Sequence, residues 1–333
     1  MKSFLPLILL LSAFAFVGCS DGDGLSNEEI KEAVRADTIF DPASDYILVL
    51  GDIQTMTYHD DNRSYLLATS RWIVNNSNSL CCVLQTGDLT ETNKPWEWKY
   101  LQEILNPVSD ALPLILCIGN HDYDWLKTKE NFLEITDRKS THINSLDIAP
   151  TTKMAIVSEF EKGCLENVLY KVRFAGGDLY ILVLEFGPRR EAVVWADSIV
   201  KSMPGEKFIL MTHEWLLRNG ELVGEAESYA KQQWLDGNFT APDRLWNELV
   251  YPNDNIRAVL CGHNGFCKHR NITNAAGRTV TQILFNLQYQ EHGGDGLVML
   301  WRDLGGSKID VSVYNIVKRA LSEDPDTRFV FEI

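Results

Sequence analysis

Short apolar runs alternate with segments of helical periodicity in the first part of the chain. The runs 46–50, 80–84 and 112–118 are continuous and mostly aliphatic, which is typical of strands buried on both faces. Between and after them, residues 63–74 and 96–108 place apolar side chains at helical spacing. This alternation predicts an α/β fold in which helices cover the faces of a sheet.

The second half of the chain is richer in strands. Residues 170–174 and 180–184 flank a Gly-Gly-Asp turn, which is typical of a hairpin, and residues 191–203 have helical spacing. Further strands are expected at 208–211, 258–261, 279–285, 296–301 and 309–316. The stretch 124–162 has no clear period, so we expect a long loop with short helices there.

The N-terminus has the pattern of an export signal. Apolar residues run from 4 to 17 behind Lys2, too few for a spanning helix of about 20 residues. We therefore expect a signal peptide at 1–18, a lipidated Cys19 with a flexible tether over 19–40, and one domain over 41–333. The Gly18-Cys19 pair resembles the lipobox of bacterial lipoproteins, which implies an exported, membrane-anchored protein in the periplasm or on the cell surface. An ordinary signal peptide with a chance cysteine stays open.

Charge and composition restrict the class of partner. The 333 residues carry a net charge of −15 and 45% are apolar, so the chain is an ordinary acidic globular protein. A protein that binds long nucleic acids would normally show a basic surface. A small anionic substrate remains compatible with the charge, because metal ions can supply positive charge.

Five polar clusters directly follow the predicted strands. They are Gly51-Asp52-Ile53-Gln54, Gly87-Asp88-Leu89-Thr90-Glu91, Gly119-Asn120-His121-Asp122, Thr212-His213-Glu214 and Gly262-His263-Asn264-Gly265. A single Gly-Asp pair is more often a turn or a helix cap, but five clusters in this order indicate one site at the strand ends. Their oxygen and imidazole ligands suit manganese, iron or zinc. Two such ions can hold a phosphate group and acidify a water, and a neighbouring histidine can protonate the leaving oxygen.

The order of these motifs resembles that of the calcineurin-like metallophosphoesterase superfamily. The resemblance runs from Asp52 to His263 and implies a four-layer αββα sandwich with two mixed sheets, flanking helices and two divalent metal ions. It implies a hydrolase of small phosphoesters that uses a metal-activated water. By position, the resemblance implies that Asp52 and Gln54 bind the first metal ion and that Asn120, His213 and His263 bind the second. It also implies that Asp88 bridges the two ions. His121 would be the leaving-group acid, oriented by Asp122.

Two positions depart from the usual motifs. Gln54 stands where most members have histidine, as in a branch that includes exported bacterial proteins, and Gly265 replaces the last histidine of Gly-His-x-His. The first metal site is therefore expected to be weak, unless water, Gln288 or His292 replaces the lost ligand. A degenerate, surface-exposed binding lipoprotein without turnover is the alternative function, and a nucleotidase stays open within the enzyme class.

A few other residues have expectations of their own. Trp125 and Trp215 follow ligand clusters closely and are expected to line the cleft, whereas Trp96 is expected in the helix core. Arg189 and Arg190 either hold a phosphate or form salt bridges at a helix start. The cysteines beyond Cys19 lie mostly in strand-like runs, and we expect few or no disulfides among them.

Overall fold

The fold is described here from a computed structural model that covers residues 24–35, 37–127 and 133–333. The expected signal peptide (1–18) and the expected lipid site at Cys19 lie outside the described residues. No helix in the described ranges combines the length and the apolar character needed to cross a membrane.

The first sheet is mixed and has seven strands in the order β15-β14-β13-β1-β2-β3, with β16 paired to β14. Its centre is parallel, because β1 pairs with β2 and β2 with β3 in the same direction, whereas β13 runs antiparallel to β1. The strands are β1 (Tyr46–Leu50), β2 (Leu80–Gln85), β3 (Leu114–Leu116), β13 (Leu297–Asp303), β14 (Lys308–Asn315), β15 (Ala320–Leu321) and β16 (Arg328–Glu332).

The second sheet also has seven strands, in the order β11-β12-β10-β9-β8-β7-β6. Four adjacent strands, β8, β9, β10 and β12, are parallel, and the edges are antiparallel. The strands are β6 (Ile156–Glu159), β7 (Val168–Phe174), β8 (Gly177–Val183), β9 (Phe208–Met211), β10 (Ile256–Cys261), β11 (Cys267–Thr273) and β12 (Thr279–Phe285). A separate hairpin joins β4 (Trp125–Lys127) to β5 (Leu133–Ile135).

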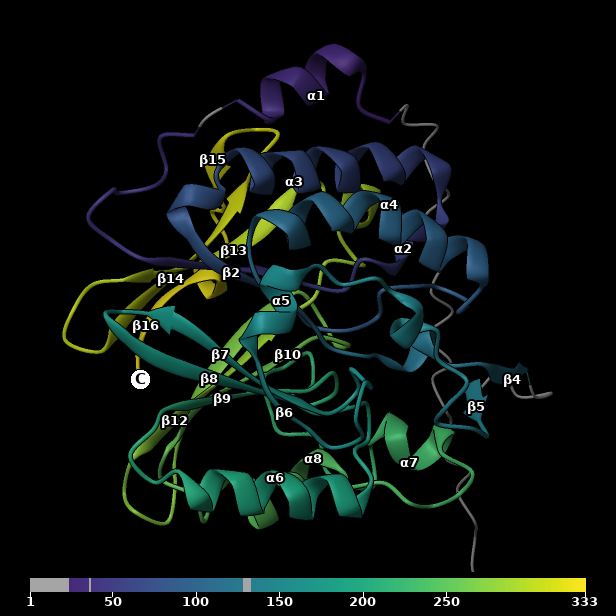
Figure 1. Cartoon of the computed structure of the whole chain (residues 1–333), viewed down its shortest axis with the longest axis vertical. Coiled ribbons are helices and arrows are strands. Elements are labelled where there is room, and N and C mark those ends of the chain that lie inside the picture. The colour runs from purple at the N-terminus through teal and green to yellow at the C-terminus, as the bar shows by residue number, and fades with distance from the viewer. Residues whose placement is uncertain (1–23, 36, 128–132) are drawn as a thin grey trace, which may run out of the picture.

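Helices cover the outer faces of both sheets, so the molecule has the layers helix, sheet, sheet, helix (Figure 1). The helices are α1 (Asn27–Ala33), α2 (Gln54–Tyr58), α3 (Arg63–Asn75), α4 (Pro95–Ala111), α5 (Pro150–Ala155), α6 (Arg190–Ser202), α7 (Tyr229–Gln233) and α8 (Pro242–Leu245). A π-helical segment, Trp246–Val250, continues α8. Short 3₁₀ turns occur at Asp60–Asn62, Ser77–Ser79, Asn120–Asp122, Ile143–Ser145, Glu291–Gly293 and Pro325–Thr327.

The strands read as unbroken apolar runs because both of their faces are buried. Every residue of β1 and β9 is buried, as expected for central strands between a helical layer and the opposite sheet. One apolar core fills the space between the sheets and under α3 and α4, and a second lies between the second sheet and α6. The predicted architecture of two mixed sheets with flanking helices is confirmed.

Elements that the pattern missed are short or polar. Strand β11 reads Cys-Lys-His-Arg-Asn-Ile-Thr, and most of its side chains are partly exposed at the sheet edge, so no apolar run marks it. Helix α1 lies inside the segment 19–40, for which we expected a tether. Ile30 and Ala33 are buried against α3, and Ser26 caps the helix together with Glu29. The folded domain therefore begins before residue 41, because these two apolar residues join the core.

Candidate metal centre

The ends of five strands bring buried polar side chains to one place between the sheets. Asp52, Asp88 and Asn120 follow the parallel strands β1, β2 and β3 of the first sheet, and His213 and His263 follow β9 and β10 of the second. All five side chains are buried. Parallel strands end on the same edge of a sheet, which explains why clusters far apart in sequence meet here.

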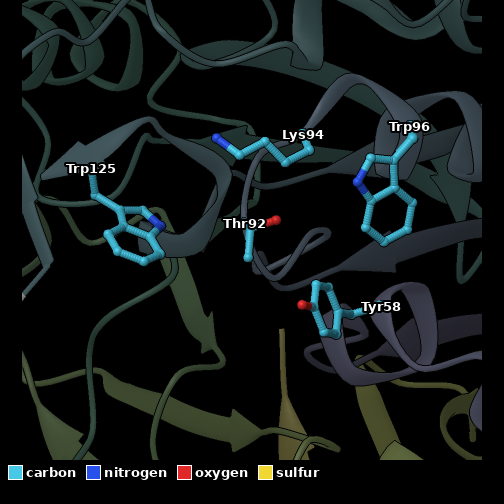
Figure 2. Close-up of a pocket in the computed structure, with 5 residues that line it drawn as sticks. All are labelled: Tyr58, Thr92, Lys94, Trp96 and Trp125. Atoms are coloured by element: carbon cyan, nitrogen blue, oxygen red, sulfur yellow. The ribbon is translucent and has the colours of Figure 1, made fainter. Parts of the chain in front are cut away.

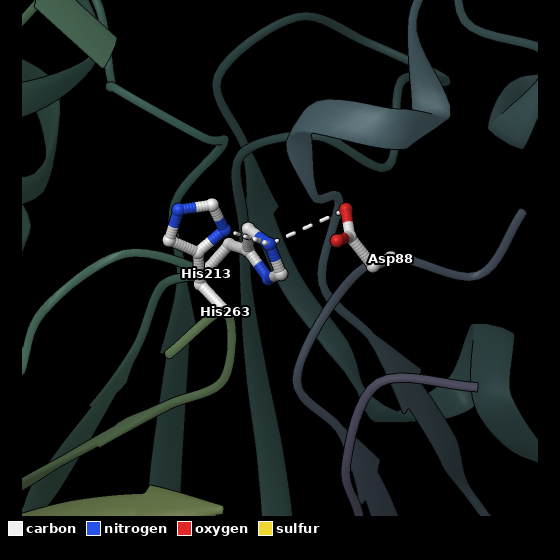
Figure 3. A group of neighbouring side chains, drawn as sticks. All are labelled: Asp88, His213 and His263. Carbon is white, nitrogen blue, oxygen red and sulfur yellow. Dashed lines mark hydrogen bonds and ion pairs between the residues drawn. The ribbon is translucent and has the colours of Figure 1, made fainter. Parts of the chain in front are cut away.

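The centre of the group is His213. Its Nε2 atom lies 3.3 Å from Asp88 Oδ1 and 3.2 Å from His263 Nδ1 (Figure 3). The same atom lies 3.2 Å from Asn120 Oδ1. The ligand atoms of Asp88, His213 and His263 all lie within 4.8 Å of one another. One nitrogen cannot donate to three acceptors at once, so the group has more electron-pair donors than hydrogens to share. Such a set fits a cation.

Hydrogen bonds that involve the backbone hold His213 and His263 in place. His213 Nδ1 lies 2.9 Å from the Thr86 carbonyl oxygen, so this nitrogen donates its proton there and leaves Nε2 to face the other ligands. The backbone N–H of His263 donates to both oxygens of Asp52, at 3.2 and 3.0 Å. The Nε2 atom of His263 is buried and has no hydrogen-bond partner, which is costly unless another ligand satisfies it.

Two glycines in the motifs are required by close packing. A Cβ on Gly119 would lie 2.1 Å from Asp88 Oδ1, and a Cβ on Gly262 would lie 2.1 Å from Asp52 Oδ1. The carboxylates therefore occupy the space of missing side chains. Asp88 and His263 have left-handed backbones with φ of 51° and 70°, a conformation that is uncommon outside glycine and that concentrates at functional sites.

The electrostatics of the group are strongly perturbed. Burial alone would raise the pKa of Asp88, but the charges of His213 and His121 outweigh it and hold the pKa below its usual range. Burial lowers the pKa of His213, yet Asp88 and Asp52 outweigh it and raise the pKa to about 10. Burial and the neighbouring His213 charge lower the pKa of His263 to about 3. Perturbed pairs of this kind cluster at functional sites.

Gln54 and Gln288 form an amide pair next to Asp88. The Gln54 Nε2 group donates to Asp88 Oδ2 at 3.1 Å and to the side-chain oxygen of Gln288. Gln288 Nε2 in turn donates to the His263 carbonyl oxygen at 3.2 Å. Gln54 Oε1 is buried without a partner, so one amide oxygen is available there. The structure thus places Gln288, one of the two suggested replacements, at the centre.

His292, the other suggested replacement, lies in a different group. Its ring stacks on Tyr65 with 4.5 Å between centroids, and its Nδ1 lies 3.6 Å from Asp295 Oδ1. The metal-ligating side chains nearest to His292 are those of Glu291, which is exposed, and Asp295, which is half-buried. The suggestion that His292 replaces the lost ligand is therefore wrong in this structure.

His121 is held by Glu91 rather than by Asp122. The His121 Nδ1 atom lies 2.9 Å from the Glu91 carbonyl oxygen and 3.7 Å from its carboxylate, and the backbone N–H of His121 donates to Asp88. Burial lowers the pKa of His121, but the charges of Asp88 and Glu91 outweigh it and raise the pKa overall.

Asp122, for which we expected the orienting role, braces the loops instead. Its carboxylate accepts hydrogen bonds from the backbone N–H groups of Leu89, Thr90 and Gly119 and from the Thr90 hydroxyl, at 2.8 to 3.1 Å. None of the hydrogen bonds found in the described residues joins it to the His121 ring. Glu91 belongs to the second motif, but nothing in the sequence alone indicates its contact with His121.

Three expectations for flanking residues are settled by burial and pairing. Trp215 is fully buried in the outer core of the second sheet, so it does not line a cleft, whereas Trp125 does line a pocket. Trp96 is 44% exposed and lines the same pocket, so its assignment to the helix core is wrong. Arg189 forms ion pairs with Glu185 at 2.8 Å and Glu161 at 3.2 Å, which supports the salt-bridge interpretation.

The comparisons with known proteins agree with this geometry. The sequence model of the calcineurin-like phosphoesterase family matches residues 46–267, which is more than half of the chain. The chain belongs to this family.

Individual relatives are distant. An uncharacterised Bacillus subtilis protein, YvnB, is 27% identical over 162 residues, which are 46% of this chain and 11% of that protein. The chain thus spans about a tenth of that relative's length. A purple acid phosphatase from yellow lupin (Lupinus luteus) seeds has a TM-score of 0.51 at 12% identity, over 88% of this chain and 54% of that one. A dimetal phosphatase from Danio rerio has a TM-score of 0.50 at 10% identity, over 86% of this chain and 98% of that one. These structures share the fold.

Proposed function

We propose that this protein is a metal-dependent hydrolase of small phosphoesters. The observation that carries the proposal is the buried group around His213 Nε2, in which carboxylate, amide and imidazole acceptors converge without enough hydrogens to satisfy them. Membership of the phosphoesterase family supports the same reaction class. Two solved structures that share the fold, a purple acid phosphatase and a dimetal phosphatase, agree with it.

The residues present fit two metal positions of unequal strength. Asp88, Asn120, His213 and His263 would hold one ion, for which manganese, iron or zinc is suited. Asp52, Gln54 and Asp88 would hold the other, with an amide and without a second imidazole. A bound divalent ion supplies positive charge for the phosphate group and acidifies water. We expect tight binding of about one ion and weaker binding of a second, because neutral amides hold transition metals less well than imidazole.

His121 is suited to the proton transfer in this reaction. It lies beside Asp88 but turns its Nδ1 toward Glu91, and both acids raise its pKa. A raised pKa favours the protonated ring, and a protonated ring can give its proton to the departing alcohol oxygen. Asp122 contributes by fixing the loops that carry Asp88 and His121.

Activity against a panel of phosphomonoesters and phosphodiesters, each with added manganese, zinc, iron or magnesium, tests the proposal. Asp88→Asn should bind less metal and lose turnover while the protein stays folded, since asparagine also tolerates the left-handed backbone of residue 88. Asp110→Asn, on the exposed end of α4, is the matched control. Parental activity and metal content in Asp88→Asn would contradict the proposed centre.

A binding protein without turnover is the second candidate function. The observation that favours it is the Gln54–Gln288 pair, which uses an amide N–H group of Gln54 to occupy Asp88 Oδ2. Gly265 removes a further side chain from this side of the centre. The same activity panel, combined with calorimetry, separates the two functions. A binding protein would bind metal and a phosphoester in calorimetry but would not hydrolyse any ester of the panel.

We further propose that Cys19 is lipidated and that the exported protein is anchored to a membrane, in the periplasm or on the cell surface. The motif before Cys19 supports this proposal. Cys19→Ser should move the protein from the membrane fraction to the soluble fraction. Unchanged fractionation, or a mass spectrum with an unmodified Cys19, would contradict the anchor.

A further inference from the structure

An aromatic pocket lies beside the residues that hold His121. It encloses about 400 Å³ and is lined by Tyr58, Thr92, Lys94, Trp96 and Trp125. Figure 2 shows Trp125 on one side and Trp96 and Tyr58 on the other, with Thr92 and Lys94 between them. This volume is within the range of pockets that bind small molecules, roughly 300–1,000 Å³.

Three chain segments connect the pocket to the metal centre. Thr92 follows Glu91, whose carbonyl oxygen lies 2.9 Å from His121 Nδ1. Trp125 follows the turn Asn120–Asp122 that contains His121, and Tyr58 ends the short helix α2 that begins at Gln54. A leaving alcohol protonated by His121 must extend away from the phosphate on the side of this histidine, and the pocket residue Thr92 is adjacent in the chain to Glu91, which contacts this histidine.

The pocket walls are fixed by a buried hydrogen-bond network. The Glu97 carboxylate is buried and accepts hydrogen bonds from the backbone N–H groups of Thr92 and Lys94, at 3.2 and 2.9 Å. Asn93 links this loop to the one before Trp125, because its side chain donates to Asp124 at 3.0 Å. Such preorganisation lowers the entropic cost of ligand binding.

The exposed groups in the pocket define a ligand chemistry. Trp96 and Tyr58 are 44% and 40% exposed, so each ring keeps free surface for stacking, although Arg63 lies 5.3 Å from the Trp96 ring centroid and the two rings lie 5.7 Å apart. The Trp125 indole N–H is buried without a hydrogen-bond partner, and in Figure 2 it is turned toward Thr92 and the pocket. No ion pair to the Lys94 amino group is found in the described residues, so a further donor is available. A planar ring with acceptor atoms on its edge would satisfy all of these groups.

We propose that this pocket holds the alcohol part of the phosphoester, and that this alcohol carries a planar aromatic ring with hydrogen-bond acceptors, as a nucleoside does. The proposal rests on the proposed hydrolase function and adds the substrate class to it. A nucleobase supplies both features, since its face stacks on aromatic side chains and its ring nitrogens and carbonyls accept hydrogen bonds. A small aliphatic alcohol would leave the rings and the indole N–H unsatisfied.

The test compares adenosine monophosphate with glycerol phosphate in the metal-loaded protein, because both esters have aliphatic alcohol leaving groups. We expect kcat/KM to favour adenosine monophosphate by about 10-fold or more, since stacking of one base is worth about 1–3 kcal/mol. Trp96→Ala and Trp125→Phe should lower this ratio, and the second variant removes the indole N–H donor while keeping a smaller aromatic ring. Tyr251→Ala, at a 43% exposed aromatic residue elsewhere, is the control and should leave the ratio unchanged.

Calorimetry with adenosine alone separates this proposal from the hydrolase proposal. Binding that is weakened in Trp96→Ala and Trp125→Phe supports the pocket even if turnover is slow. Equal kcat/KM for the two esters, with no change of the ratio in either variant, would overturn the aromatic leaving group and leave the hydrolase function standing. Adenosine binding in the pocket without turnover of any ester would overturn its assignment as a leaving-group site.

Discussion

Gly265 is the position where restoring the usual histidine of the family would test the structure most directly. On sequence alone, Gly265→His should restore a ligand of the first metal. The structure predicts a different result, because Gly265 has a φ of +67°, which side chains rarely adopt. A Cβ there would lie 3.1 Å from Arg218 Cγ and 3.2 Å from Arg218 Cα. The side chain would therefore begin strained and pressed against Arg218.

The cost can be divided into two parts. A left-handed backbone costs about 1–2 kcal/mol for a residue with a Cβ, and packing extra atoms into an occupied space costs about 1–3 kcal/mol. Gly277 has a φ of +78° with no atom within 4 Å of its Cβ position, so it isolates the first part. We expect Gly277→Ala to lower the free energy of unfolding by about 1–2 kcal/mol and Gly265→Ala by about 2–5 kcal/mol.

Urea unfolding followed by circular dichroism measures these values, and metal titration by calorimetry measures the ions bound. Gly265→His should be less stable than the parent and bind no additional ion. The double variant Gly265→His/Arg218→Ala should regain part of the lost stability, because the close contact with the Arg218 side chain is removed. A Gly265→His protein with parental stability and a newly tight second ion would refute this reasoning.

Three further predictions follow from other contacts. Glu91→Gln removes a charge that raises the pKa of His121, so the ring should lose its proton at a lower pH and the alkaline fall in activity should shift to lower pH. An unchanged profile of kcat/KM against pH would contradict this prediction. Gly119→Ala should cost about 3 kcal/mol of unfolding free energy and much of the bound metal, because the new Cβ would collide with Asp88; urea unfolding and metal analysis measure both. Ile30→Ala should lower the free energy of unfolding by about 2 kcal/mol, whereas no change would show that α1 is dispensable.

The sequence was sufficient to predict which residues converge. Continuous apolar runs identify central strands, and parallel strands bring the residues after them to one edge. Asp88 and His213 therefore lie 3.3 Å apart although 125 residues separate them in the chain. Helical spacing likewise predicted α3 and α6 with ends within a few residues of the observed ones.

The sequence was not sufficient to predict which neighbour each polar group chooses. His121 and Asp122 are adjacent, yet the chain turns between them, so that Asp122 meets backbone N–H groups and His121 meets Glu91. Proximity in sequence also failed for the tryptophans. Trp215 and Trp125 each follow a ligand cluster, but Trp125 lies in the short strand β4 and lines a pocket, whereas Trp215 is buried in the outer core of the second sheet. These contacts depend on the direction that each loop takes after its strand, and no periodic pattern in the sequence indicates that direction.

We expect the two proposed metal positions to differ in affinity, for a reason that both sequence and structure support. Ring nitrogens of His213 and His263 lie 3.2 Å apart, and burial together with the charge of His213 lowers the pKa of His263, so the His263 ring has its electron pairs free for a ligand. A cation bound between these two ring nitrogens would attract the electron pairs of both, which would otherwise repel each other. At the other position, Gln54 donates to Asp88 Oδ2, so a cation must displace an existing hydrogen bond and turn the amide before Gln54 Oε1 can bind it. We expect that rearrangement to reduce the affinity for a cation even where an oxygen ligand is present, so the Gln54–Gln288 pair should weaken this proposed site in addition to the missing imidazoles.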